Sequence, residues 1–331
     1  MPEEYGRVLG FLQEVAPDYG FTGEWFRWKY LDNPMGPPYI YFAEDGEKKV
    51  LAGIYCVISW SLRSGKAPVK AVQSVDTMIN PAYRGQGIVK NLSELMFRDL
   101  RDMHVDLIFG FPNEDFFPTT LKIGWKNPGS MKTFVKVLSF DKILGKNAGR
   151  LPRSCRKILD MLLNIPDLVR MASCRGLSME EAGGSSRYAG TDNPFVPEIT
   201  TPRTPDYLRW RYDDNPLRKY RMFTLVRGGA AVCLVVGRDT GRELTIIDIA
   251  AGSERDMLAA LGLLADRVRK DGVIALRTSC YGRMEGLLRK AGFFFREDGL
   301  PLVTYPLSSD PDAPWNLERN WHFMPGDIDV M

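Results

Sequence analysis

The sequence predicts an α+β (α/β) protein that is built from two tandem copies of one fold. Its 331 residues are enough for two ordinary domains, each with its own core. The segment WFRWKYLDNP, which starts at Trp25, is echoed in register by YLRWRYDDNP from Tyr207. A second match closes each copy in the same order, with LKIGW from Leu121 and RKAGF from Arg289. Two matches in the same order indicate a tandem duplication.

Hydrophobic periodicity predicts the same layout for both copies. In the first copy we expect a helix at 25–31 and then three strands at 39–42, 50–62 and 69–79. A helix at 90–100, a strand at 105–111 and a helix at 115–123 should follow. The second copy follows that order over residues 208–213, 222–226, 230–236, 244–250, 254–269, 273–278 and 281–291. Each copy should therefore contain a meander of strands together with helices.

These segments place the first domain at residues 1–144 and the second at 206–331. The connector, residues 145–205, contains an apolar-periodic stretch at 154–172 and then a run rich in Gly, Ser and Pro. We expect a helix there whose basic face is solvated, with a role toward a membrane surface or an anionic substrate as the alternative. The C-terminal tail is aromatic and acidic, and it should pack back on the body of the protein.

Composition excludes several classes of function. A formal net charge of +3 is too small to predict a nucleic-acid partner. Five scattered cysteines and two histidines predict neither a disulfide framework nor a metal site. The apolar runs have the length of strands, so no membrane insertion is expected, and the predicted location is cytoplasmic.

One glycine-rich stretch carries most of the chemistry. Residues 84–87, RGQG, lie between the strand that ends near Ile79 and the helix that begins near Lys90. Glycines let the backbone turn its N–H groups toward one point, and a helix start adds further unpaired N–H groups, so this geometry suits a pyrophosphate. The spacing fits neither the dinucleotide-binding GxGxxG fingerprint nor Walker A.

The phrase PAYRGQGI, from Pro81 to Ile88, resembles the acyl-CoA loop of the GNAT N-acetyltransferase superfamily. That loop usually reads Gln/Arg-x-x-Gly-x-Gly/Ala, and here Val89 stands at its last position. The resemblance implies that each copy forms a mixed, mostly antiparallel twisted sheet flanked by helices. It also implies acetyl-CoA or another acyl-CoA as co-substrate, no metal, and direct transfer of the acyl group to an amine. A glycine-rich turn without a ligand is the alternative.

The same resemblance assigns the cofactor-binding residues. Backbone N–H groups of the loop would hold the pyrophosphate, the end of the preceding strand would polarise the thioester carbonyl, and an Asn after the next strand would contact CoA. These residues are Arg84, Gly85, Gln86, Gly87, Ile88 and Val89, then Thr77, Met78 and Ile79, and then Asn113. The second copy has AAGSER from Ala250, where Glu254 would compete with a phosphate, so one site is expected.

Catalytic candidates follow from sequence position. Asp76 is the carboxylate nearest the transfer point and is the candidate base, although a strand aspartate satisfied by its neighbours is equally consistent. The family's usual thiolate acid is a Tyr, and Leu121 stands at that position here. Tyr83, Tyr30 or water would then serve as the acid. His322 in the tail is a further catalytic candidate.

The acceptor is suggested by the doubled organisation, which resembles the bipartite GNAT enzymes of bacterial surface-polysaccharide pathways. That resemblance implies a nucleotide-linked deoxyamino sugar, dTDP- or UDP-linked, as the acceptor. Trp28 and Tyr30 are candidate substrate-binding residues, with a core role as the alternative, and Arg209 and Arg211, with Arg203, would bind the diphosphate.

Other functions stay open from the sequence. A peptide, a protein or another small molecule could supply the amine, or the chain could bind acyl-CoA without catalysis. The protein is expected to be a monomer or a homodimer.

Overall fold

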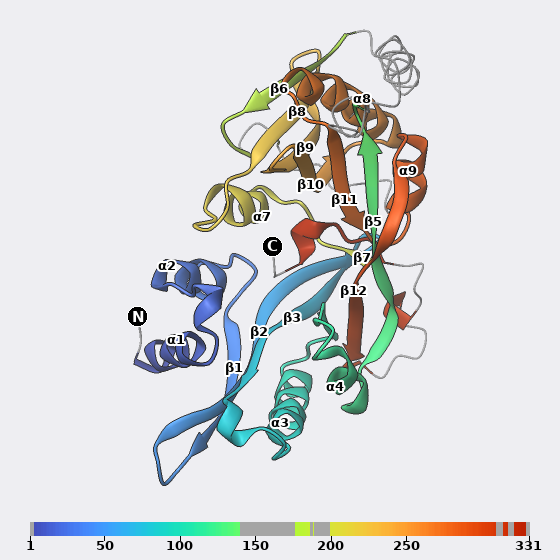
Figure 1. The fold of residues 1–331 in the computed structure, drawn as a ribbon. Coiled ribbons are helices and arrows are strands. Elements are labelled where there is room, and N and C mark those ends of the chain that lie inside the picture. Colours follow the sequence, from blue (N-terminus) through green and yellow to red (C-terminus); the bar gives the residue numbers. More distant parts are fainter. Residues whose placement is uncertain are drawn as a thin grey trace, which may run out of the picture. The chain divides into compact units, whose positions relative to one another are not determined.

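The structure, a computed structural model, describes residues 3–139, 176–185, 188, 199–308, 314–316 and 321–328. It divides into two compact units, each with a mixed sheet flanked by helices (Figure 1). Unit 1 is drawn from residues 1–129, 214–218 and 300–318, and unit 2 from residues 130–213, 219–299 and 319–331. The predicted α/β fold class is confirmed. The contiguous boundaries at residues 144 and 205 stay a prediction.

Unit 1 begins with a helix that the sequence pattern had not predicted, α1 (Glu3–Val15), followed by a short 3₁₀ turn, η1 (Pro17–Tyr19). The predicted helix over 25–31 is present as α2 (Gly23–Phe26), and it continues without a break as a π-helix, η2 (Arg27–Leu31). Thr22 caps α2 because its side chain accepts the Trp25 backbone N–H at 3.1 Å.

The sheet of unit 1 is antiparallel except at one point. Its order is β1 (Pro38–Asp45), β2 (Val50–Ser64), β3 (Ala67–Ile79), β4 (Leu107–Gly110) and β12 (Phe294–Pro306). The pair β3–β4 is parallel, and its register ends at Ser74 opposite Gly110, although β3 runs on to Ile79. The β2–β3 register also shifts between Tyr55 and Val57. Together the shift and the early end of pairing open a gap beyond Gly110.

Helix α3 (Ile88–Asp102) follows β3 and covers one face of this sheet. Its apolar side chains pack on sheet residues and on the start of α4 (Phe117–Lys122). The buried cluster includes Leu92, Met96, Phe97 and Leu100 from α3 with Tyr55, Val57 and Val72 from the sheet. This burial fixes the start of α3 beside the end of β3.

Unit 2 repeats the arrangement. Its sheet runs in the order β5 (Lys126–Val137), β11 (Ala275–Cys280), β10 (Glu243–Ala251), β9 (Ala230–Thr240), β8 (Arg221–Arg227) and β6 (Leu177–Ala182). Among these described strand pairs, β10–β11 is parallel and the others are antiparallel. Helices α8 (Glu254–Lys270) and α9 (Met284–Lys290) pack with this sheet around a large apolar cluster.

The two copies exchange strands. In unit 1, β4 pairs with residues 303–306 of β12, which comes from the end of the second copy. In unit 2, β11 pairs with residues 132–137 of β5, which comes from the end of the first copy. Each unit therefore needs both halves of the chain to complete its sheet.

The duplicated segment that the sequence shows is also duplicated in structure. Like α2 and η2, α7 (Pro205–Leu208) runs directly into a π-helix, η6 (Arg209–Asp213). Its cap, Thr204, accepts the Tyr207 backbone N–H at 3.2 Å. The repeat therefore specifies a particular backbone path as well as a composition.

Two expectations outside the repeat have different outcomes. The predicted connector contains a strand, β6, that belongs to the sheet of unit 2, whereas its predicted helix over 154–172 lies outside the described residues. The described end of the tail, residues 321–328, is buried in unit 2, as expected.

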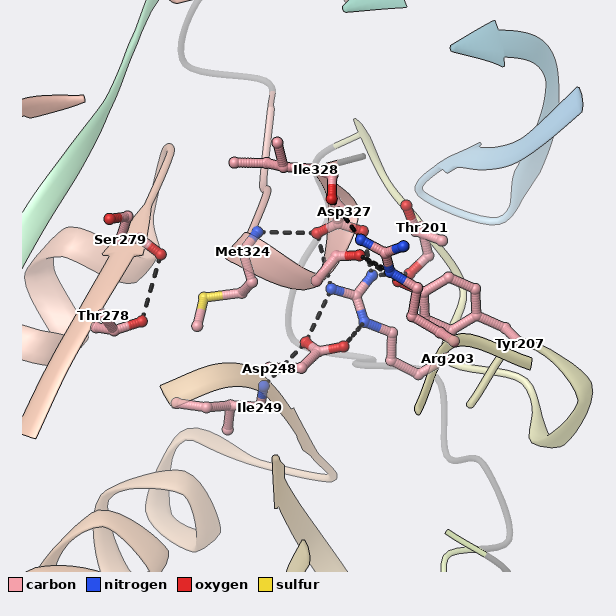
Figure 2. Close-up of polar contacts among 12 residues, drawn as sticks. Thr201, Arg203, Tyr207, Asp248, Ile249, Thr278, Ser279, Met324, Asp327 and Ile328 are labelled. Carbon is pink, nitrogen blue, oxygen red and sulfur yellow. Dashed lines mark hydrogen bonds and ion pairs between the residues drawn. The ribbon is translucent and has the colours of Figure 1, made fainter. Parts of the chain in front are cut away.

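A buried ionic network ties that tail to unit 2 (Figure 2). The Arg203 guanidinium donates to Asp248 with Nε at 2.8 Å and to Asp327 with Nη2 at 2.8 Å. The side chains of Arg203 and Asp248 are each 2% exposed, and that of Asp327 is 0% exposed. Tyr212 Oη also donates to Asp248 at 2.6 Å. Burial, followed by the charge of Asp248, raises the pKa of Tyr212 well above its usual value, so this hydroxyl keeps its proton.

Replacing Arg203 by Met should strongly destabilise unit 2, because two carboxylates would remain buried without a counter-charge. The expected loss in the free energy of unfolding is about 3–5 kcal/mol. Arg209→Met is the control, since Arg209 and its partner Asp206 are exposed and their pair contributes about 0–1 kcal/mol. Denaturant titration followed by circular dichroism measures both variants. Equal stability of the two would contradict the structural role of Arg203.

Candidate functional site

A pocket of about 780 Å³ opens in unit 1 at the gap where β3 continues beyond β4. Three parts of the chain line it: the end of α1 with η1, the end of β3 with the glycine-rich turn, and the segment after β4. The lining residues include Thr77, Met78, Ile79, Tyr83, Arg84, Gly85, Gly87, Ile88, Val89 and Asn113. The structure therefore brings together all but one of the residues predicted to bind the cofactor, and the exception is the exposed Gln86.

The glycine-rich turn has the backbone geometry of an anion site. Gly85 and Gly87 have φ angles of 78° and 76°, in the left-handed region that favours glycine. No protein atom lies within 4 Å of a Cβ built on either residue. Gly87 is the residue before α3, and it has no side chain that could cap the first N–H groups of the helix. These N–H groups and the positive helix end are available to an anion.

A tyrosine fastens this turn to the β1–β2 hairpin. Tyr83 Oη donates to Asp45 Oδ2 at 2.7 Å, and Lys48 Nζ lies 5.5 Å from the centre of the Tyr83 ring. The hydrogen bond to Asp45 raises the pKa of Tyr83. A phenol that is held in this way is a weaker acid, so the contact favours an anchoring role for Tyr83.

The end of β3 offers backbone donors to the same pocket. The Asn80 N–H donates to the Ala52 carbonyl on β2 at 3.0 Å. Because successive N–H groups of a strand point to opposite edges, the N–H groups of Ile79 and Thr77 point away from β2. That edge is the one from which β4 has already departed. An acyl carbonyl in the gap would find donors there.

The remaining loop residues have structural partners as well. Ile88 and Val89 line the pocket and also pack on the apolar cluster under α3. The branched side chain at Val89 is therefore accommodated by the core. Asn113 Oδ1 accepts the Phe116 backbone N–H at 2.9 Å, which shapes the turn after β4 and holds Asn113 at the pocket wall.

Asp76, the candidate base, accepts two hydrogen bonds from η2. Lys29 Nζ donates to Asp76 Oδ2 at 2.6 Å, and Tyr30 Oη donates to the same oxygen. The Lys29 side chain is 3% exposed and that of Asp76 is 13% exposed. This ion pair joins the first repeated segment to β3 three residues before the strand ends, and Asp76 adjoins the pocket residues Thr77 to Ile79 without lining the pocket itself.

The aromatic candidates for the acceptor pocket lie inside unit 1. Trp28 and Tyr30 are buried, and the Tyr30 ring packs against Phe26 and Trp25 with centroids 4.7 and 5.9 Å apart. In this geometry both residues contribute to the core, and Tyr30 also positions Asp76.

The other predicted residues belong to unit 2. His322 is buried there. Arg209 is exposed and pairs with Asp206 at 3.0 Å. Arg211 is 2% exposed, and its guanidinium donates to the carbonyl oxygens of Gly326 and Ile328. Arg211 and Arg203 therefore hold the chain's own tail in this structure.

Sequence reasoning missed two residues that hold the site. Lys29 binds Asp76, and Asp45 binds Tyr83. Lys29 carried a signal, because the repeat has a basic residue, Arg211, at the same place. Asp45 carried none, since its role depends on how the β1–β2 hairpin meets the turn.

The described residues contain neither a candidate metal site nor a candidate membrane span. No group of three or more His, Cys, Asp or Glu side chains is arranged there to hold a metal ion. None of the helices in the described part of the chain combines the length and apolar composition needed to cross a bilayer.

Comparison with known proteins agrees with this geometry. Residues 8–127 match the family described as "Acetyltransferase (GNAT) domain". This match spans α1 to the start of β5 and so contains every residue that lines the pocket. No sequence among the curated proteins matches the chain.

Solved structures share the fold over most of the chain. A probable N-acyltransferase from Enterococcus faecalis is 10% identical with a TM-score of 0.65, covering 93% of this chain and 71% of its own. A GCN5-related N-acetyltransferase from Anabaena variabilis is 11% identical with a TM-score of 0.61, and the match covers 92% of this chain and 71% of the other. N-myristoyltransferase from Saccharomyces cerevisiae, solved with myristoyl-CoA, is 10% identical with a TM-score of 0.53, covering 92% and 80%.

At these identities the solved structures establish the fold. The match of residues 8–127 to a GNAT acetyltransferase domain supports an acyl-CoA-dependent transferase that acylates an amine.

Proposed function

We propose that unit 1 binds acyl-CoA in the pocket at the end of β3 and transfers the acyl group to the amino group of a nucleotide-linked deoxyamino sugar. One observation carries the acyl-CoA part of this proposal. The glycine-rich turn, the unpaired edge of β3 and Asn113 all border the same pocket. The cytoplasmic location predicted from the sequence is part of the proposal.

Different parts of the pocket would bind different parts of acyl-CoA. The N–H groups around Gly85 and Gly87 and the start of α3 would receive the pyrophosphate. The pantetheine arm would extend into the gap between β3 and the segment after β4. The thioester carbonyl would then reach the N–H groups of Thr77 or Ile79, which act as oxyanion donors.

The reaction needs no covalent acyl-enzyme. The neutral amine attacks the thioester carbonyl carbon, a C–N bond forms, and the C–S bond breaks as the CoA thiolate leaves. The ammonium form of the acceptor must first lose a proton, and the attacking nitrogen loses a second one as the amide forms. The thiolate gains one proton, and the other is released to solvent. Asp76 is our candidate for the first transfer, because its carboxylate is held next to the end of β3.

The acceptor class rests on the tandem organisation of the chain rather than on arginines in unit 2. Arg203 and Arg211 are buried on internal partners, which leaves Arg209 as the exposed residue of the three. Recognition of the sugar nucleotide therefore has to come mainly from the pocket side of unit 1. There Tyr19, 68% exposed, offers an aromatic surface beside the open end.

We expect thiol release from acetyl-CoA in the presence of a dTDP- or UDP-linked amino sugar. The assay compares a panel of these nucleotides with lysine peptides and aminoglycosides. Turnover on one nucleotide sugar would support the acceptor class. Turnover on a peptide alone would replace it, and acyl-CoA binding without turnover on any amine would favour a non-catalytic role.

Gly87→Glu should abolish acyl-CoA binding. The new carboxylate would occupy the position proposed for the phosphate, and its charge would oppose a dianionic ligand. Gly87→Gln is the matched control, since it introduces the same backbone strain at φ 76° without the charge. Isothermal titration with acetyl-CoA measures both variants. A folded Gly87→Glu variant with wild-type affinity would contradict the assignment of the loop.

Asp76→Asn should reduce turnover, by a larger factor at low pH than at high pH. At high pH the amine is already neutral, and a base has less to contribute. The exposed Asp102→Asn variant on α3 serves as the control for a lost surface carboxylate. Rate profiles across pH test this role. An equal loss at every pH would leave Asp76 as a structural partner of Lys29.

A further inference from the structure

We propose that the gap between β10 and β11 of unit 2 is a peptide-binding site, and that its ligand is the chain's own segment 321–328. The site is the counterpart of the acyl-CoA pocket of unit 1. The inference does not depend on which amine unit 1 acylates.

The gap in unit 2 forms in the same way as the one in unit 1. Parallel pairing of β10 with β11 ends at Thr245 opposite Arg277, while β10 runs on to Ala251. The β9–β10 register shifts between Ile246 and Asp248, as the β2–β3 register does in unit 1.

An aspartate marks the corresponding place in both units. Asp248 and Asp76 stand at the same distance from the ends of their strands, Ala251 and Ile79. Each accepts a hydrogen bond from the tyrosine of the repeated segment, Tyr212 or Tyr30. The two gaps are therefore equivalent positions of one duplicated fold.

The tail fills the gap in unit 2. Phe323 exchanges backbone hydrogen bonds of 3.0 and 3.4 Å with Tyr281, the residue after β11. The next turn, η9 (Pro325–Asp327), contacts both β10 and β11. Met324 joins the apolar cluster of unit 2. In unit 1 the space beyond the paired strands is the open pocket.

The contacts in Figure 2 are those of a receptor with its ligand. The carboxylate of Asp327 accepts Nη1 and Nη2 of Arg203, both at 2.8 Å. The carbonyl of Gly326 accepts Tyr207 Oη at 3.0 Å and Arg211 Nε at 2.8 Å. Such bidentate recognition is specific for a carboxylate at one position of a peptide.

The ligand must have glycine before that carboxylate. A Cβ at Gly326 would lie 2.1 Å from Tyr212 Oη and 3.2 Å from Asp248 Oδ2. No side chain fits there unless Tyr212 moves. The site therefore selects a Gly-Asp pair that follows apolar residues, which is the sequence FMPGD of the tail.

The start of α8 explains why this gap does not hold a phosphate. Ser253 caps α8 by accepting the Asp256 backbone N–H at 3.1 Å, and its hydroxyl donates to the Asp256 side chain at 2.8 Å. Glu254 and Asp256 place negative charge in the first turn. These groups occupy the positive helix end that is open in unit 1.

Hydrogen exchange on the full-length chain tests the proposal. In the wild type, the amides of Phe323, Asp327 and Ile328 should be protected like those of β10. Gly326→Ala should speed their exchange about tenfold or more, whereas the amides of β3 in unit 1 should not change. Asp206→Asn is the control, because this carboxylate pairs with Arg209 on the surface. Unprotected tail amides in the wild type would overturn the proposal.

A peptide added in trans tests the site itself. A labelled peptide with the sequence of residues 319–331 should bind the Gly326→Ala chain and not the wild type, whose site is occupied. The same peptide carrying Asp327→Asn should bind about tenfold more weakly. Full-length Asp327→Asn, a nearly isosteric change, provides a second host if Gly326→Ala does not fold. Equal binding to the wild type, or no binding to either host, would overturn the proposal.

Discussion

Both units depend on two parallel strands that pair over only part of their length. Beyond the last pair, Ser74–Gly110 in unit 1 and Thr245–Arg277 in unit 2, backbone N–H and C=O groups lose their partners in the sheet. Such groups must be satisfied by other parts of the chain, by solvent or by a ligand. In unit 1 they border the pocket, and in unit 2 the chain's own tail supplies partners at Tyr281.

The sequence predicted the parts of this arrangement that are local. The glycines at positions 85 and 87 indicate the turn, because its positive φ angles disfavour most other residues. Hydrophobic periodicity predicts the positions of α3 and α8. The repeat was also readable, because Trp, Tyr and Asp-Asn-Pro positions coincide in both copies. The roles proposed for the pocket residues stay predictions.

What the sequence did not predict depends on contacts between distant segments. The strand exchange needs β12 to pair with β4 across most of the chain, and no local pattern encodes a partner. The ion pair of Lys29 with Asp76 and the bond of Tyr83 to Asp45 likewise join separate elements. Arg203 illustrates the same limit, since its burial between two internal carboxylates cannot be read from residue type.

The repeated segment has Lys29 in the first copy and Arg211 in the second. This difference helps to explain why the gap in unit 1 is an open pocket and the gap in unit 2 holds the tail. Lys29 is a compact point charge, and its ammonium reaches Asp76. The guanidinium of the corresponding Arg211 donates to two carbonyls of the tail. Asp248, which corresponds to Asp76, is paired with Arg203 instead. A guanidinium suits an extended peptide because its donors are spaced and directional. The change at this position and the capped start of α8 fit the tail that fills unit 2, whereas unit 1 keeps an uncapped start of α3 beside its pocket.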